Sequence, residues 1–134
     1  PKIELVTEDI SVFPFEKCDL MISYYVIQFI HPKIRQELYR TIYDSLNWGG
    51  ASLLFEKTRG PDARFQDITT AVYNEYKLAN GYNADEITAK SRSLKGVLEP
   101  FSSEGNIDLL RRAGFKDIMC VMKYICFEGF LAIK

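Results

Sequence analysis

The residues best suited to chemistry in this sequence lie directly after short apolar segments. Asp9 with Ile10, Tyr24 with Tyr25, and Glu56 each follow such a segment. In open α/β sheets, ligands bind beyond the carboxyl ends of the strands. An aspartate beside an apolar residue suits an aromatic base, because the carboxylate accepts a hydrogen bond from an exocyclic amine. Asp9 is also a common residue of tight turns, and the sequence leaves both roles open.

Several tyrosines, and one arginine in a predicted helix, provide a second set of candidates. Tyrosine stripes on helices usually pack in a core, and the alternative is a pocket wall that stacks on a ligand ring. Arg92 lies beside Lys90 and Ser91, where a solvated helix face is the default and an anion-binding site is the sharper hypothesis. The tyrosines concerned are Tyr24, Tyr25, Tyr73, Tyr76 and Tyr82.

Several standard sites are excluded. His31 is the only histidine and precedes Pro32 at a predicted helix start, and no G-x-S-x-G motif accompanies it. One histidine and three separated cysteines do not form a standard zinc site, so we expect no metal. No G-x-G-x-x-G or P-loop motif is present. We interpret Cys120 and Cys126 as small buried residues in a reducing cytoplasm.

The composition is that of an ordinary globular domain. The 134 residues are 47% hydrophobic and 26% charged, and the net charge is −1. No basic stripe is present, so we expect no direct nucleic-acid binding. No apolar run reaches the roughly 18 residues of a membrane span, so we expect no membrane insertion.

Hydrophobic periodicity predicts alternating strands and helices. Apolar runs predict strands at about 2–7, 18–26, 51–56, 116–124 and 126–134, the second of them covered on both faces. Helices are predicted to begin near Pro32, Asp62, Asn83, and Ser102 or Ser103. Residues 47–50 and Gly114 are predicted to end the first and the last of these helices. The apolar stripes are Ile34, Leu38, Ile42 and Leu46 in the first helix and Phe65, Ile68, Val72, Tyr76 and Ala79 in the second.

This order of elements predicts a single α/β domain over residues 1–134. Strands that alternate with helices indicate a mostly parallel sheet, and the last two strands indicate an antiparallel hairpin at its edge. A helical insertion spans about residues 60–97, and no linker divides the chain.

Several segments together resemble the later half of a class I S-adenosylmethionine-dependent methyltransferase, which has a Rossmann-like fold. They are Asp9 with Ile10, the strand at 19–26, LNWGG at 46–50 and RAGF at 112–115. A second set resembles the carboxy-S-adenosylmethionine synthase family over almost the whole chain: residues 28–29, 42–43, 54–57, 79–82, 86–87 and 97–98. Those enzymes use prephenate to convert S-adenosylmethionine into its carboxylated form. A second enzyme uses the product in a tRNA wobble-uridine modification.

The resemblance implies roles for individual residues. Asp9, Ile10 and Tyr24 would bind the cofactor, S-adenosylmethionine or carboxy-S-adenosylmethionine, and Tyr24 and Arg92 would take part in catalysis. The implied substrate pocket comprises Tyr25, Glu56, Tyr76, Tyr82 and Arg92. Helices within residues 62–95 would roof this pocket and help to form a homodimer.

Two departures from the family pattern keep the reaction type open. The family has an asparagine at the position of Tyr24, and its carboxylate-binding arginine aligns with Ser91, one place before Arg92. One helical position turns a side chain by about 100°. Methyl transfer to a small-molecule or RNA-pathway acceptor therefore stays open beside carboxyl transfer.

The resemblance also implies that the chain lacks part of the fold. The family opens with a strand, a glycine-rich loop and a second strand that ends in a ribose-binding acid, and none of these is in the sequence. We therefore expect a C-terminal fragment of a larger cytoplasmic transferase, inactive alone and weak in cofactor binding. Residues 1–10 are expected to be disordered, paired elsewhere or swapped into a second chain.

Two interpretations from other classes remain. One is a non-catalytic α/β module for assembly or regulation, which has kept the fold and lost the cofactor site. The other is a different doubly wound nucleotide-binding domain, such as half of a dehydrogenase, whose glycine fingerprint would normally follow the first strand.

Overall fold

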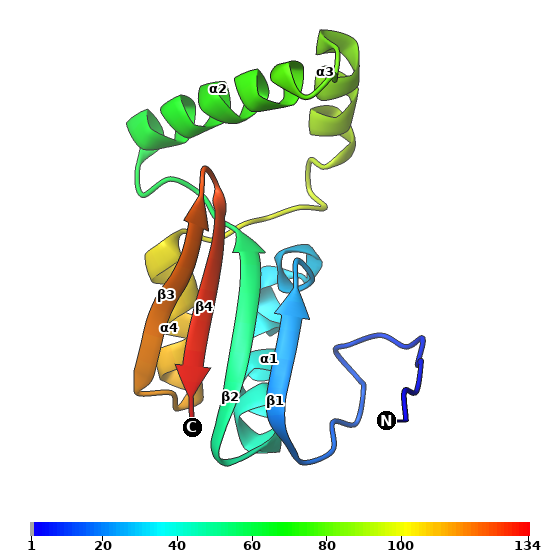
Figure 1. Cartoon of the computed structure of the whole chain (residues 1–134), viewed down its shortest axis with the longest axis vertical. Helices are drawn as coiled ribbons and strands as arrows, with labels where there is room; N and C mark the ends of the chain where they lie inside the picture. The colour runs from blue at the N-terminus through cyan, green and yellow to red at the C-terminus, as the bar shows by residue number, and fades with distance from the viewer. Residues whose placement is uncertain (1) are drawn as a thin grey trace.

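The computed structural model describes residues 2–134 and contains one four-stranded sheet (Figure 1). The strands are β1 (Cys18–Tyr24), β2 (Leu46–Lys57), β3 (Asp117–Tyr124) and β4 (Phe127–Ile133), in the spatial order β1-β2-β4-β3. β1 runs parallel to β2, whereas β4 is antiparallel to both β2 and β3. The predicted antiparallel hairpin at the edge is confirmed. The sheet of residues 2–134 is mixed rather than mostly parallel, because β4 returns antiparallel beside β2 and only the pair β1 and β2 is parallel.

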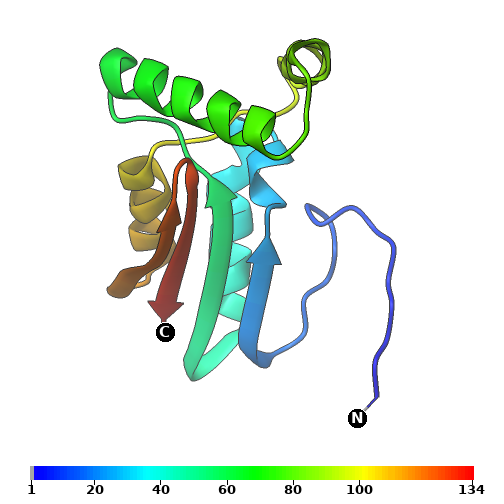
Figure 2. The ribbon, with the colours of Figure 1, turned by 45° about the horizontal axis from the view of Figure 1, so that its top comes forward.

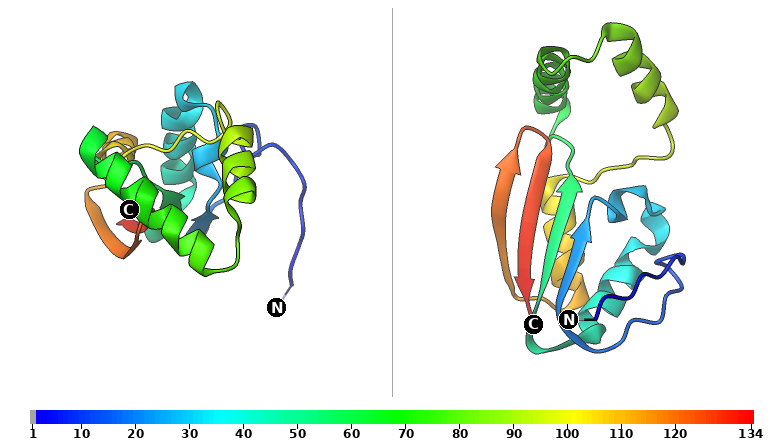
Figure 3. Two further views of the ribbon diagram at one scale, coloured as in Figure 1. Left: turned by 90° about the horizontal axis from the view of Figure 1, so that it is seen from above. Right: turned by 45° about the vertical axis from the view of Figure 1, so that its right-hand side comes forward.

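Four α-helices and one short 3-10 helix lie on one face of the sheet and beyond its strand ends. They are η1 (Ile27–Phe29), α1 (Pro32–Ser45), α2 (Ala63–Ala79), α3 (Ala84–Ser93) and α4 (Ser103–Ala113). α1 and α4 pack on the same face of the sheet, whereas α2 crosses beyond the carboxyl ends of β1 and β2 (Figure 2 and Figure 3). The helical insertion thus lies at the end of the sheet where ligands of α/β proteins bind.

The core lies between the sheet and the pair α1 and α4. Tyr39, Phe115 and Phe130 are its largest side chains and are almost completely buried. Alternate residues of β2 point into this core, as the period of a strand requires. On the opposite face, Ile22 and Tyr24 of β1 are 57% and 67% exposed, and within residues 2–134 no helix packs there. The prediction that this strand is covered on both faces is therefore wrong.

Side-chain caps explain why the helices begin where the sequence predicts. Asp62, Asn83 and Ser102 each accept a hydrogen bond from a backbone N–H in the first turn of α2, α3 and α4. Asn83 and Glu86 form the predicted capping box. His31 caps α1, since its Nδ1 accepts from Lys33 N at 3.2 Å.

Three local predictions are wrong. Residues 2–7 form no strand and are exposed, and the free edge of β1 has no partner among the described residues. Residues 47–50 do not end α1 but belong to β2, where Gly49 N and Gly50 O bond to Lys134 at 2.9 Å. Cys120 is exposed on the edge strand β3, whereas Cys126 is buried as predicted. The part of the prediction that concerns residue 1 lies outside the described residues.

Gly114 ends α4 as predicted, and its backbone requires glycine. Its φ is +127°, in the region that side chains disfavour. A Cβ at this position would lie 2.8 Å from Cζ of Tyr43, whose ring packs edge-on against Phe115. Both the turn and the core packing therefore require that residue 114 has no side chain.

We expect Gly114→Ala to lower the free energy of unfolding by about 2–4 kcal/mol, because backbone strain adds to overpacking against Tyr43. Urea denaturation measures this loss. Gly96→Ala is the matched control, since Gly96 has a φ of +72° but no neighbour within 4 Å of the added Cβ. Its loss is expected to be about 1 kcal/mol, and equal losses in the two variants would contradict the role of Tyr43.

Candidate functional site

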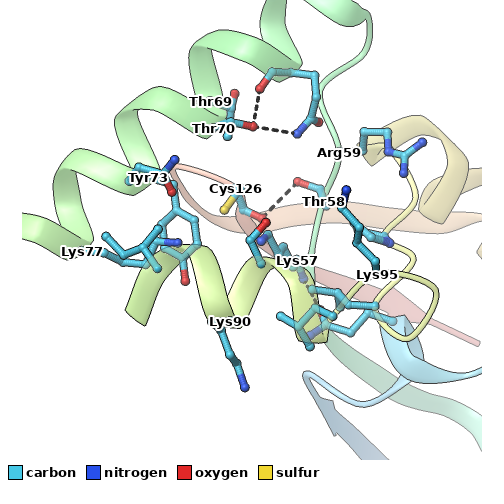
Figure 4. A pocket seen from close by; sticks show the side chains of 18 of the residues that line it. Lys57, Thr58, Arg59, Thr69, Thr70, Tyr73, Lys77, Lys90, Lys95 and Cys126 are labelled. Atoms are coloured by element: carbon cyan, nitrogen blue, oxygen red, sulfur yellow. Dashed lines mark hydrogen bonds between the residues drawn. The ribbon is translucent and has the colours of Figure 1, made fainter. Parts of the chain in front are cut away.

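A cavity of about 640 Å³ lies beyond the carboxyl end of β2, beneath α2 and α3 (Figure 4). Its walls come from the end of β2, from α2, from α3 and the segment after it, and from the turn between β3 and β4. Gln28 and Phe29 of η1 complete the lining. This volume is in the range of small-molecule sites.

The charge of this cavity is one-sided. Six basic side chains line it, and no aspartate or glutamate does. The whole chain has a net charge of −1, so the cavity concentrates positive charge that the rest of the surface does not carry. A cavity of this kind favours an anionic ligand. The basic residues are Lys57, Arg59, Lys77, Lys90, Arg92 and Lys95.

Two of these cations share one aromatic ring. The ammonium groups of Lys57 and Lys77 lie over the ring of Tyr73, at 4.9 Å and 4.4 Å from its centre. Burial, and then the charge of Lys57, lowers the pKa of Lys77. Burial raises the pKa of Tyr73 and of Cys126, which lies at the same end of the cavity. We find no reactive thiolate here, because burial outweighs the two lysines at Cys126.

Aromatic contacts join three of the predicted site tyrosines to the cavity wall. Tyr24 packs edge-on against Tyr25, which packs against Phe127 at 5.5 Å between ring centres. Phe127 packs against Tyr73, and Tyr73 stacks with Tyr76 at 6.4 Å. Phe127 and Tyr73 line the cavity, whereas the three predicted tyrosines adjoin it. Tyr25 has a φ of +56°, and burial raises the pKa of its hydroxyl.

Glu56 lies in the core rather than in the cavity. Neighbouring residues of a strand point to opposite faces, so Lys57 enters the cavity and Glu56 turns inward. The carboxylate is 2% exposed and accepts a hydrogen bond from Ile27 N at 3.1 Å. In return, Gln28 Oε1 accepts from Lys57 N at 2.6 Å. These two bonds tie the end of β2 to η1.

Burial raises the pKa of Glu56 to about 7, against the lowering effects of the backbone N–H groups of η1 and of Arg35. Arg35 is also buried, and burial lowers its pKa. Its guanidinium donates to the carbonyls of Ile30 and Gln28 at 2.7 Å and 3.0 Å. The surroundings of Glu56 are therefore structural, and its role in the substrate pocket stays a prediction.

The remaining predicted site residues lie in different places. Arg92 lines the cavity, and so does its neighbour Ser91. Tyr82, in the turn between α2 and α3, is 56% exposed. Asp9 forms a turn, since its carboxylate accepts from N and Oγ of Ser11 at 2.9 Å and 2.8 Å, and these bonds lower its pKa. The roles predicted for these residues stay predictions.

Most residues of the cavity lining carry no local signal in the sequence. Lys57 follows a predicted strand and was a weak signal, but Lys77 carries none, because it lies 20 residues further on in the last turn of α2. Thr58, Thr69 and Thr70 were also missed. Only the crossing of α2 over the sheet brings these polar residues together.

Within residues 2–134, no helix is both long and apolar enough to cross a membrane. No three histidine, cysteine, aspartate or glutamate side chains of these residues are grouped to hold a metal ion.

Solved structures establish the fold. The chain superposes on human N-acetylserotonin methyltransferase in complex with S-adenosylmethionine with a TM-score of 0.63 and 20% identity, covering 95% of this chain and 32% of that one. It superposes on an O-methyltransferase family 2 protein from Planctomyces limnophilus with a TM-score of 0.64 and 18% identity, covering 95% and 33%. The fold is that of the C-terminal part of a class I S-adenosylmethionine-dependent methyltransferase, which confirms the predicted fold class.

Sequence relatives are more specific. The chain is 36% identical over 132 residues to the carboxy-S-adenosyl-L-methionine synthase of Staphylococcus epidermidis, covering 98% of this chain and 58% of the relative. It is 38% identical to the synthase of Campylobacter jejuni, covering 98% and 56%. The predicted resemblance to this family is therefore confirmed. The chain spans less than two thirds of the length of these relatives, and no protein-family model matches it.

We expect the stability contributed by Glu56 to fall as the pH rises. Its pKa is near 4.5 in the unfolded chain and about 7 in the fold, so the folded state holds this proton more tightly. The stabilisation is complete below pH 4.5 and is lost as the pH rises through about 7, and it amounts to about 3 kcal/mol. Urea denaturation between pH 4.5 and 7.5 measures it.

Glu56→Gln is the test, because the amide has the shape of the protonated acid and does not titrate. Its decline in stability over this pH range should be smaller than that of the native chain by about 3 kcal/mol. Parallel curves for the two proteins would contradict the raised pKa of Glu56.

Proposed function

We propose that this chain is the substrate-binding part of a carboxy-S-adenosylmethionine synthase. The observation that carries the proposal is the cavity beyond β2, which six cations and no acids line. Transfer of a carboxyl group requires cations that hold an anionic donor and the new carboxylate. Similarity to carboxy-S-adenosyl-L-methionine synthases over 98% of the chain supports the same function.

Arg92 is the residue that we assign to the carboxylate. It lines the cavity together with Ser91, the position that aligns with the family arginine. The planar guanidinium forms two parallel hydrogen bonds with a carboxylate, which fixes its orientation. We assign Asp9, Ile10 and Tyr24 to the cofactor, which is S-adenosylmethionine or its carboxylated form. Tyr24 ends β1 at the edge of the sheet that faces the cavity.

Methyl transfer is the second candidate. The fold is shared with O-methyltransferases, and in-line displacement at a sulfonium methyl group needs alignment more than acid–base groups. This reaction, however, does not explain six unbalanced cations. Carboxyl transfer does, because its donor and its product both carry carboxylates.

The cellular setting is part of the proposal. We propose that the enzyme works in the cytoplasm and that its product serves tRNA modification by a second enzyme. The chain itself needs no nucleic-acid site for this role. The cavity suits a small anionic substrate, and its basic residues gather around one cavity rather than along a stripe.

We also propose that the protein is a homodimer with α2 at the interface. Four apolar residues of α2 form a stripe that is 40–52% exposed: Phe65, Ile68, Val72 and Tyr76. Their spacing places them on one side of the helix. The polar residues of α2 line the cavity, so the apolar stripe is free to pack against the same stripe of a second chain.

We expect Arg92→Ala to lower the yield of carboxylated product at least about tenfold, because one charge-assisted bidentate contact is lost. The complete gene product is incubated with S-adenosylmethionine and prephenate, and mass spectrometry measures the carboxylated and the demethylated cofactor. Arg64→Ala is the control, since Arg64 is exposed on α2 and lies outside the cavity lining.

The same measurement separates the candidate functions. Demethylated cofactor without carboxylated product would indicate methyl transfer, and an unaltered yield in the Arg92 variant would remove Arg92 from the site. If the complete gene product neither binds nor converts the cofactor, the proposed function is overturned in favour of a non-catalytic module. The 134-residue chain is measured beside it, and we expect it to bind the cofactor weakly.

We expect Ile68→Asp with Val72→Asp to convert the dimer into a monomer, because two charges would be buried in an apolar interface. Size-exclusion chromatography with light scattering should give twice the 15.5 kDa chain mass for the native chain and that mass for the variant. Lys33→Asp with Lys116→Asp, at two exposed positions outside α2, is the control. A native chain that is monomeric at high micromolar concentration would refute the proposed interface.

A further inference from the structure

We propose that Lys57 and Lys77, over the ring of Tyr73, bind one oxyanion group of the second substrate, at a site separate from that of Arg92. The oxyanion is a carboxylate or a phosphate. The second substrate is the one required by the proposed function, so that part of the inference rests on it. The binding of an oxyanion by these two lysines is a property of the chain alone.

The first argument is that these two lysines have no acidic partner. The ion pairs among residues 2–134 are Arg111 with Asp108 and Lys123 with Glu128, and neither involves the cavity. Both ammonium groups are over one ring, at 4.9 Å and 4.4 Å from its centre. The charge of Lys57 lowers the pKa of Lys77, so the two ammonium groups repel each other, and an anion bound to both would relieve this repulsion.

The second argument is that the fold holds the two lysines in place. Lys57 ends β2, where its backbone N–H donates to Gln28 Oε1 at 2.6 Å. Lys77 lies in the last turn of α2, four residues after Tyr73 and therefore on the same side of the helix. The ring fixes the position of both ammonium groups before a ligand arrives, which lowers the entropy lost on binding.

The third argument concerns solvation. Burial lowers the pKa of Lys77, and the positive charge of Lys57 lowers it further. A bound anion would reverse the second effect, so the pKa of Lys77 should rise when the site is filled. Arg92 belongs to α3, on a different wall of the cavity, and it would hold a second anionic group of the same ligand or the new carboxylate.

The experiment is an NMR titration of the 134-residue chain with inorganic phosphate and, separately, with malonate, at constant ionic strength set by sodium chloride. The signals followed are the ring of Tyr73 and the side-chain ammonium groups of the lysines. We expect saturable shifts at Tyr73 and Lys77, and a pKa of Lys77 that rises at saturation. Tighter binding of malonate would identify a carboxylate site, and tighter binding of phosphate a phosphate site.

Lys57→Met with Lys77→Met is the variant, because methionine keeps the length of the side chain and removes the charge. We expect its dissociation constant to be at least about tenfold higher. Lys33→Met with Lys116→Met removes the same charge from two exposed positions and should change it less than about twofold. If the first variant unfolds, the pKa of Lys77 in the native chain decides the question.

The outcomes are distinct from those of the proposed function. No saturable shift in the native chain, an unchanged pKa of Lys77, or equal affinity in the two double variants would overturn the oxyanion site. Cofactor binding by the complete gene product is measured separately. If it fails while Lys57 and Lys77 still bind the anion, the oxyanion site stands and the proposed transferase function falls.

Discussion

The structure depends on a reciprocal pair of hydrogen bonds between the end of β2 and η1. Glu56 Oε1 accepts from Ile27 N, and Gln28 Oε1 accepts from Lys57 N. Each side chain satisfies a backbone donor of the other segment, in a place where an unpaired N–H would be costly. These two bonds join η1, which follows Tyr24 and Tyr25 at the end of β1, to the end of β2, where Lys57 lies. The two sides of the site are therefore positioned by one buried contact.

The same pair of hydrogen bonds directs Glu56 into the core and Lys57 into the cavity. Because side chains of a strand alternate, β2 turns Glu56 inward and Lys57 outward at its carboxyl end. Arg35 donates to the carbonyls of Gln28 in η1 and of Ile30 directly after it, and this fixes Gln28 and Phe29 in the cavity wall. An anionic ligand would thus meet groups that need little rearrangement, which is the condition for strong electrostatic stabilisation.

Local signals in the sequence were sufficient for most of the fold. Caps at Asp62, Asn83 and Ser102 have their effect within one helical turn, so they could be recognised without knowledge of the packing. The predictions that were wrong depend on tertiary contacts, which local signals do not report. Residues 2–7 have the composition of a strand but find no partner beside β1, and residues 47–50 resemble a helix stop but pair with the end of the chain. Of the residues predicted for the site, Arg92 lines the cavity, and Tyr25 and Tyr76 contact its lining through Phe127 and Tyr73. Lys77 could not be predicted, because only the folded chain places it over the ring that it shares with Lys57.

The two sides of α2 differ in character. Its polar side closes the cavity, and its apolar stripe is left exposed, which is the reverse of an ordinary surface helix. A helix with this pattern gains little from packing on its own sheet, and within residues 2–134 none of its residues is fully buried. In the proposed dimer, the stripe would gain the burial that the sheet does not provide. At the proposed oxyanion site, a bound anion would offset the repulsion between Lys57 and Lys77 and would so favour the position of α2 over the strand ends.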